Sequence, residues 1–436
     1  MRTSLYRWTA TAATVTVVFG AGTAAQVTVH REQLSNGLVL LHTRTGPSPT
    51  VAVCGFVRAG AAAEAPLQAG LRQLLVRVLL DQPGAEGARR RAMVADLGAR
   101  VAADVAPDFV EVSICASAED LEAVLALLRS LLLEPEFDAE TVGRQQAFLL
   151  AEVRRRETTL AGLADRAAAA ALYPQRTMGL LLTGTEKPSV PSAGDLAEFH
   201  RAHFAVNHLV VSVAGAVSRD TLSAAARRRF GGLLPGGTTM RQAPPAPLDG
   251  PAALDLPAEG DAALVEVVGR APAVDDDTAP ATAVALAVLG DGMGSRLFQA
   301  FREQDGLAYT ARTFSVPAAQ EARAGVMVTC HKAQADLVSK LVRREVERLQ
   351  EVLPTEEELR RAAQYLITQY RLAHQGNQGL AHALGAFEVS AREHGYGWDL
   401  ELPGRLRAVR AGDAREASRR LLAAAVTVRV GVSGLP

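Results

Sequence analysis

Hydrophobic and polar residues alternate in short runs along this chain, and longer stretches with the apolar spacing of helices separate these runs. The runs at Gly37–Thr45 and Thr50–Gly60 predict strands, and Gly70–Leu80 predicts an amphipathic helix. A hairpin-like pair over 100–117 and two long helices follow. The second half repeats this order from a strand at 262–272 onward. Antiparallel strands mixed with helix pairs predict an α+β fold in each half.

A stretch dense in proline and glycine divides the 436-residue chain near its middle. It lacks apolar periodicity, as is typical of a linker. We therefore expect two homologous α/β-sandwich domains, one over 26–235 and one over 261–436, joined by a linker at 236–260. The repeated order of elements suggests an internal duplication.

The first 25 residues differ from the rest of the chain. They contain Arg2 and Arg7, no acidic residue, and an apolar run that ends in small residues at Thr23–Ala25. This pattern predicts a secretory signal peptide over 1–25, with an uncleaved membrane anchor as the alternative. We expect an exported protein, in a bacterial periplasm or associated with a membrane outside the cytoplasm.

The composition of the chain argues against two classes of protein, those that bind nucleic acids and those held together by disulfides. The chain is 48% hydrophobic and 21% charged, with a formal net charge of −1. Mixed charges of this kind give no reason to expect a nucleic-acid partner. The three cysteines are too few for a disulfide scaffold, so Cys54, Cys115 and Cys330 are interpreted as buried thiols, with a Cys54–Cys115 bridge as the alternative.

Three polar patterns make local predictions. Ser117 with Asp120, and Thr355 with Glu358, have the spacing of helix N-terminal caps. The basic run Arg89–Arg91 is interpreted as a solvated helix face.

Several longer segments resemble one family. They include "VRAGAAAEAPLQAGLRQLL", "LLAEVRRRE", "GMGSRLFQAFREQDGLAY" and "PTEEELRRAAQYL". In their order and spacing they resemble the pitrilysin/insulinase family of inverted-motif zinc peptidases, in the branch of the processing peptidases. The resemblance implies a two-domain peptidase fold and a peptide substrate.

In that family, the helix after the Gly-Leu pair carries His-x-x-Glu-His, whose imidazoles bind zinc while the glutamate acts as general base. The matching positions here are Gln73, Val76 and Arg77. An amide oxygen is a weak ligand, valine has no lone pair, and arginine stays protonated. We therefore expect no metal and no catalytic residue in this chain, and no activity when it is alone.

The family's third zinc ligand is a glutamate on a later helix, and Glu152 matches its position. The plain alternative is a solvated glutamate in a run of arginines. The spacing also suggests a hypothesis, that Glu152 forms an ion pair with Arg77 where the zinc would be.

The second half retains another feature of the resemblance. The segment "REQDGLAY" matches a motif in which an arginine and a tyrosine hydrogen-bond the bound peptide, which implies substrate binding by Arg302 and Tyr309. The resemblance thus implies the non-zinc subunit of a heterodimeric peptidase, with the zinc in a homologous partner and no cofactor in this chain. The alternative is a catalytically inactive scaffolding or peptide-binding protein of the same fold.

Overall fold

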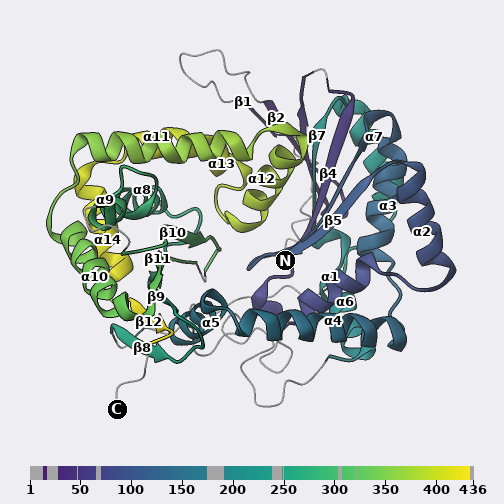
Figure 1. Ribbon diagram of the computed structural model, residues 1–436. Coiled ribbons are helices and arrows are strands. Elements are labelled where there is room, and N and C mark those ends of the chain that lie inside the picture. Colours follow the sequence, from purple (N-terminus) through teal and green to yellow (C-terminus); the bar gives the residue numbers. More distant parts are fainter. Residues whose placement is uncertain are drawn as a thin grey trace, which may run out of the picture.

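Two β-sheets, each with helices on both faces, form the computed structural model (Figure 1). The structure describes residues 13–16, 28–46, 48–64, 70–173, 191–237, 248, 250–302, 307–320 and 322–432. Within these ranges, sheet A has seven strands in the order β1-β2-β3-β7-β4-β6-β5, and sheet B has five in the order β10-β11-β9-β12-β8. This mixed arrangement confirms the predicted α+β class.

The strands are β1 (Ala13–Thr16), β2 (Thr28–Gln33), β3 (Val39–Arg44), β4 (Thr50–Val57), β5 (Arg100–Val105), β6 (Val110–Ser117), β7 (Leu209–Gly215), β8 (Ala252–Leu256), β9 (Ala262–Arg270), β10 (Thr310–Val316), β11 (Arg323–His331) and β12 (Val426–Val430). The helices are α1 (Leu71–Leu80), α2 (Gly84–Asp96), α3 (Leu121–Leu133), α4 (Ala139–Glu157), α5 (Leu160–Leu172), α6 (Ala193–His203), α7 (Arg219–Phe230), α8 (Ala279–Gly290), α9 (Arg296–Arg302), α10 (Ala335–Glu351), α11 (Glu356–Ala373), α12 (Gly376–Ser390), α13 (Tyr396–Ala408) and α14 (Ala411–Leu422).

The two sheets share one topology. The order β3-β7-β4-β6-β5 in sheet A corresponds to β8-β12-β9-β11-β10 in sheet B. In both, the first pair is parallel and each later pair is antiparallel. A repeated order with repeated strand directions supports two homologous domains.

Strand β4 shows why the sequences of the central strands are continuous apolar runs. Val51 and Val53 belong to the hydrophobic cluster under α1 and α3, whereas Cys54 and Phe56 belong to the cluster under α12. Alternate side chains point to opposite faces of a sheet, so a strand that is buried on both faces needs apolar residues throughout.

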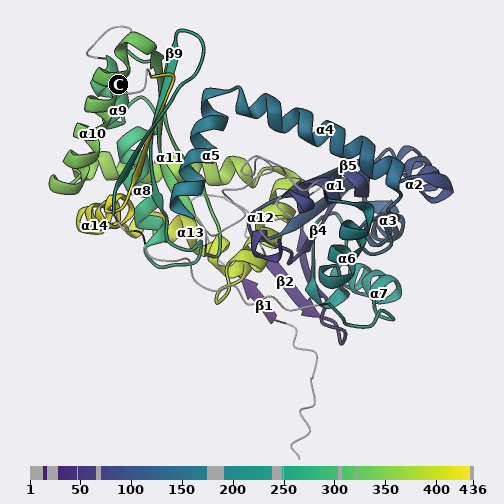
Figure 2. The ribbon, with the colours of Figure 1, turned by 90° about the horizontal axis from the view of Figure 1, so that it is seen from below.

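Each sheet receives one helix from the other half of the chain. Helix α5 packs its Ala164, Ala168 and Leu172 on β9 and β12 of sheet B. Helix α12 packs its Leu380 and Leu384 on β4 and β7 of sheet A. Figures 1 and 2 show the long helices α4 and α11 leading from one half to the other toward these contacts.

Polar contacts also hold α12 on sheet A. The His382 ring nitrogen Nδ1 lies 2.7 Å from a carboxylate oxygen of Glu111 on β6. Asn377 donates its side-chain N–H to the Thr50 carbonyl at 2.9 Å. These contacts join residues far apart in the sequence, so the two halves form one structure.

The predicted caps differ in outcome. Thr355 and Glu358 form the expected capping box, because each accepts a hydrogen bond from the other's backbone N–H. The prediction at Ser117 was wrong, since its side chain makes no capping hydrogen bond. A short 3-10 turn at Ala118–Asp120 comes first, and α3 begins only at Leu121.

The cysteines and the chain ends complete the comparison with the sequence. Cys54, Cys115 and Cys330 are free thiols, so the alternative Cys54–Cys115 bridge is not formed.

Strand β1 lies within the predicted signal peptide, whose other residues are outside the described ranges, and β8 lies within the stretch predicted as a linker. None of the helices in the described ranges combines the length and apolar character needed to cross a bilayer.

Candidate functional site

Helices α1 and α4 lie side by side and place the motif positions opposite Glu152. Gly70, in a left-handed conformation with φ 88°, precedes α1. The apolar residues of α1, such as Leu74 and Leu75, are buried in the core of the first half. Gln73 and Arg77 are four residues apart and share the helix face that turns toward α4.

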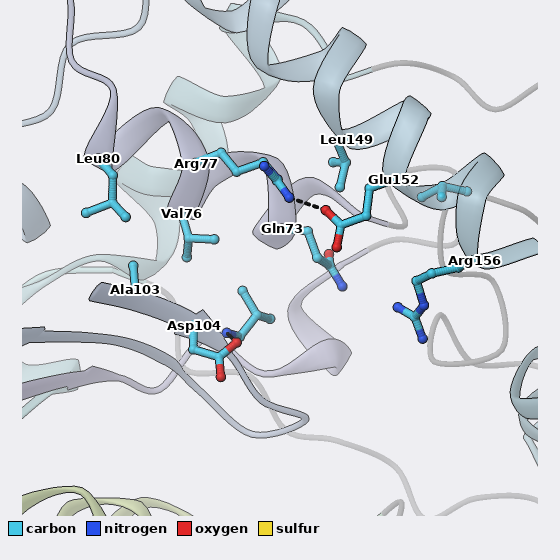
Figure 3. Close-up of a pocket in the computed structure, with 11 residues that line it drawn as sticks. Gln73, Val76, Arg77, Leu80, Ala103, Asp104, Leu149, Glu152 and Arg156 are labelled. Atoms are coloured by element: carbon cyan, nitrogen blue, oxygen red, sulfur yellow. Dashed lines mark hydrogen bonds and ion pairs between the residues drawn. The ribbon is translucent and has the colours of Figure 1, made fainter. Parts of the chain in front are cut away.

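A pocket of about 530 Å³ lies between α1, α4 and the edge strand β5. Figure 3 shows Arg77 of α1 and Glu152 of α4 pointing toward each other, with Asp104 on the wall formed by β5. The lining residues are Gln73, Val76, Arg77, Leu80, Ala103, Asp104, Val105, Leu149, Glu152, Val153 and Arg156. The pocket therefore contains every motif position identified in the first half.

The ion pair that the spacing suggested is present. A terminal nitrogen of Arg77 donates a hydrogen bond to a carboxylate oxygen of Glu152. The two side chains are 34% and 40% exposed, so the pair is partly solvated. Glu152 is therefore not the isolated solvated glutamate of the alternative interpretation.

The residues of this site do not fit zinc. Arg77 places a positive charge at a ligand position. It also hydrogen-bonds the Glu152 carboxylate, which would otherwise be the third ligand. Val76 presents methyl groups where the general base would lie. Of the three positions that match His-x-x-Glu-His, only Gln73 has a side-chain oxygen, and this Oε1 atom is buried and accepts no hydrogen bond from the described residues. In the described part of the chain, no group of three or more His, Cys, Asp or Glu side chains is placed to hold a metal.

The end of α1 is fixed to α4 by a second set of charges. Arg144 and Gln145 on α4 donate hydrogen bonds to the Asp81 carboxylate at 2.8 and 2.7 Å. The hydrogen bond from Arg144 is the main reason why the pKa of Asp81 lies below its usual value. This contact keeps α1 and α4 in register, although α1 no longer carries the motif.

The structure places the second predicted pair elsewhere. Arg302 is the last residue of α9, and its side chain lies outside the described part of the structure. Tyr309 precedes β10, is 63% exposed, and donates its backbone N–H to the Thr329 carbonyl at 2.7 Å. Tyr309 does not line the pocket between α1 and α4, so the chain does not bring its two predicted sites together there.

Sequence reasoning missed two charged residues of this pocket. Asp104 lies on β5, where exposed and half-buried residues alternate, and Arg156 lies at the end of α4. Asp104 lies outside the quoted segments, and Arg156 lies within "LLAEVRRRE" but at no position that was assigned a role. The alternating pattern of the β5 segment was the only available signal, because it indicates one open face on that strand.

Two family models match long segments of this chain. Residues 38–186 match the model of a family described as insulinase (peptidase family M16). Residues 192–366 match the model described as peptidase M16 inactive domain.

Among curated proteins, the chain is similar to an uncharacterized zinc protease of Streptomyces coelicolor, with 26% identity over 384 residues that cover 83% of this chain and 81% of that protein. It is also similar to an uncharacterized zinc protease of Mycobacterium leprae, with 31% identity over 198 residues that cover 44% of each.

Among solved structures, a peptidase M16 inactive domain from Pseudomonas fluorescens has a TM-score of 0.82 at 18% identity, covering 93% of this chain and 98% of that one. A protease from Helicobacter pylori has a TM-score of 0.81 at 15% identity, with coverage of 92% and 98%. At these identities the likeness concerns the fold, which matches over nearly the whole chain.

Proposed function

We propose that this chain, which belongs to the insulinase family (peptidase family M16), acts as the non-zinc subunit of a heteromeric peptidase and binds peptides for a zinc-bearing homologous partner. One observation carries the proposal. The Arg77 guanidinium is paired with Glu152 at the position where a family peptidase would bind its metal. A chain with this pair has no general base or metal ligand set of its own at that site.

The second half of the chain supports a role in binding. Tyr309 is largely exposed, so its phenol can donate a hydrogen bond to a group outside this chain. An arginine and a tyrosine together supply donors suited to a peptide carbonyl. Because Tyr309 lies away from this chain's own pocket, the proposal assigns Arg302 and Tyr309 to a peptide held at the partner's site. Residues 1–25 would direct the protein out of the cytoplasm.

The test is a peptidase assay on a library of quenched fluorescent peptides. The chain is assayed alone and mixed with a zinc-motif homologue from the same organism. We expect cleavage above the homologue's own rate only in the mixture, and loss of that gain with Arg302→Ala or Tyr309→Ala. Arg312→Ala and Tyr365→Ala, at exposed positions of the same half, serve as matched controls and should keep the gain.

Two results would contradict the proposal. Cleavage by the chain alone, abolished by a chelator, would identify an independent peptidase. No gain in the mixture, or a gain unaffected by either substitution, would favour the scaffolding alternative.

A further inference from the structure

A second pocket, of about 180 Å³, lies between helices α2, α3 and α7 and shares no lining residue with the pocket beside α1. We call it the arginine pocket. Its lining residues are Arg89, Arg90, Met93, Ala126, Leu127, Arg129, Ser130, Glu134 and Arg229. Four guanidinium groups from three helices therefore surround one small space, with a single carboxylate among them.

Arg90 is a buried cation that donates no hydrogen bond to a carboxylate among the described residues. It is only 6% exposed, so the expectation of a solvated helix face at Arg89–Arg91 was wrong for Arg90, whereas Arg89 and Arg91 are exposed. The Arg90 guanidinium donates to the Ser130 hydroxyl at 2.6 Å, to the Gln82 side-chain oxygen at 2.8 Å and to the Glu134 backbone carbonyl at 2.6 Å. All three acceptors are neutral, so the buried charge of Arg90 is not matched by a hydrogen-bonded anion.

Arg129 has unused donor capacity at the same pocket. It donates to the Glu134 carboxylate at 2.7 Å and to the Arg229 carbonyl at 3.2 Å. Its Nε atom is buried and has no hydrogen-bond partner among the described residues. A buried donor of this kind normally has a partner in the functional state of a protein.

The rim adds two further cations. Arg229 donates a hydrogen bond from its Nε atom to the Glu122 carboxylate on α3, at 3.1 Å. Arg89 is 68% exposed and lies 3.4 Å from Glu86. Both side chains are partly exposed, at 68% for Arg89 and 42% for Arg229, so each guanidinium can be reached by a ligand from solvent.

We propose that the arginine pocket binds a phosphate group. Arginine side chains match the geometry and charge of phosphate, and several converging guanidinium groups favour a dianion over chloride. The group could be inorganic phosphate, a small phosphomonoester or the headgroup of an anionic lipid, which share this chemistry. The inference stands apart from the proposed role in peptide binding, since it uses other residues.

The first experiment measures phosphate binding to the full chain by calorimetry, at constant ionic strength set with sodium chloride. Arg229→Gln should weaken binding about fivefold or more, because it removes one rim donor. The matched control is Arg227→Gln on the same helix, whose partner is Glu32 outside the pocket, and it should leave the affinity unchanged.

A second variant should gain affinity, a result that loss of folding could not produce. Glu134 competes with phosphate for Arg129, so Glu134→Gln should bind phosphate more tightly than the unmodified chain, by about threefold. Phosphate binding no tighter than chloride binding would overturn the proposal, as would equal affinities in all four proteins.

Sedimentation with vesicles distinguishes the sources. If a lipid headgroup is the natural ligand, the unmodified chain should sediment with vesicles of phosphatidic acid in phosphatidylcholine. The Arg229→Gln variant should then stay in the supernatant. Phosphate binding in calorimetry without retention on these vesicles would support a soluble phosphate compound.

Discussion

Arg72 and Arg77 lie on the same helix, α1, and each contacts a glutamate, but their surroundings differ. Arg72 and Glu64 are almost fully buried, and Arg72 also donates to the Ala106 carbonyl at 2.6 Å. Arg77 and Glu152 are about a third exposed. Breaking a buried pair leaves an unpaired charge away from water, whereas a partly exposed pair is screened.

Substitutions at the two glutamates should therefore differ in cost. Glu152→Gln should lower the free energy of unfolding by less than about 1 kcal/mol. Glu64→Gln should lower it by about 3 kcal/mol, since it removes the carboxylate charge that lies 3.5 Å from the buried Arg72 guanidinium. Urea unfolding of both variants measures the difference, and equal costs would show that the Arg77–Glu152 pair is as important for the fold as the buried one.

The buried Glu266 should make the stability of the folded protein depend on pH. It is 1% exposed on β9, and burial, together with the nearby Asp165 of α5, raises its pKa to about 7. In the unfolded chain its pKa is 4.5, so the folded state holds this proton more tightly. Its contribution to stability is complete below about pH 4.5 and is lost as the pH rises through 7.

Glu266→Gln should therefore stabilise the protein at pH 8, by up to about 3 kcal/mol, and change little at pH 5. The comparison needs urea unfolding at both pH values. Glu140→Gln, at a 91% exposed position, is the control and should behave alike at both. A gain at pH 8 no larger than the gain at pH 5 would mean that Glu266 is ionised without cost in the fold.

At the scale of single residues, some contacts could be read from the sequence and others could not. The Arg77–Glu152 pair was predictable because both positions belong to one motif. The buried state of Arg90 was not, because three neighbouring arginines on a polar helix are usually solvated. Its burial depends on Ser130 and Glu134, which only the packing of α3 against α2 brings close.

The pair of helices α1 and α4 keeps the frame of a metal site at the scale of elements. Asp81, Arg144 and Gln145 hold the two helices in register, and Glu152 faces α1. If this frame is intact, the missing ligands alone prevent metal binding.

The triple variant Gln73→His, Val76→Glu, Arg77→His should consequently bind zinc, at about one ion per chain after dialysis. Elemental analysis of the purified protein measures this. The same variant with Glu152→Gln added should bind at least about tenfold more weakly. A triple variant that retains no zinc would show that the separation of α1 and α4 has changed as well as their side chains.

The positions of most elements were predictable because apolar periodicity is a local signal. β3, β4 and α1 lie where the pattern placed them, and the two-sheet repeat follows from the repeated order. The start of α3 was missed, since a 3-10 turn before a helix has the same composition as a cap. Arg302 and Tyr309 were identified from a motif, and the role given to them stays a proposal.

The exchange of α5 and α12 between the two halves could not be predicted at the scale of the whole molecule. An apolar stripe on a helix shows that the helix is buried, but not which sheet buries it. Gly385 of α12 makes the contact unusually close, because a Cβ atom at this position would lie 2.0 Å from the Phe56 ring of β4.

Gly385→Ala should force α12 away from sheet A and lower the free energy of unfolding by about 1–3 kcal/mol. Gly397→Ala is the matched control on the next helix, where an added Cβ would meet nothing within 4 Å. The control should be neutral or slightly stabilising, because alanine favours a helix over glycine. Calorimetry of both variants decides the point, and a neutral Gly385→Ala would mean that α12 is only loosely seated.

The position of α12 late in the chain has a consequence for biogenesis. The central strands of sheet A are complete when Gly215 has been made, but the helix that covers their second face begins only at Gly376. At a synthesis rate of about 5–20 residues per second, this face stays uncovered for roughly 10–30 seconds on the ribosome. A nascent chain of this protein therefore offers a lasting apolar target to a holding chaperone, and under the proposed export such capture would keep it unfolded enough for passage through a channel.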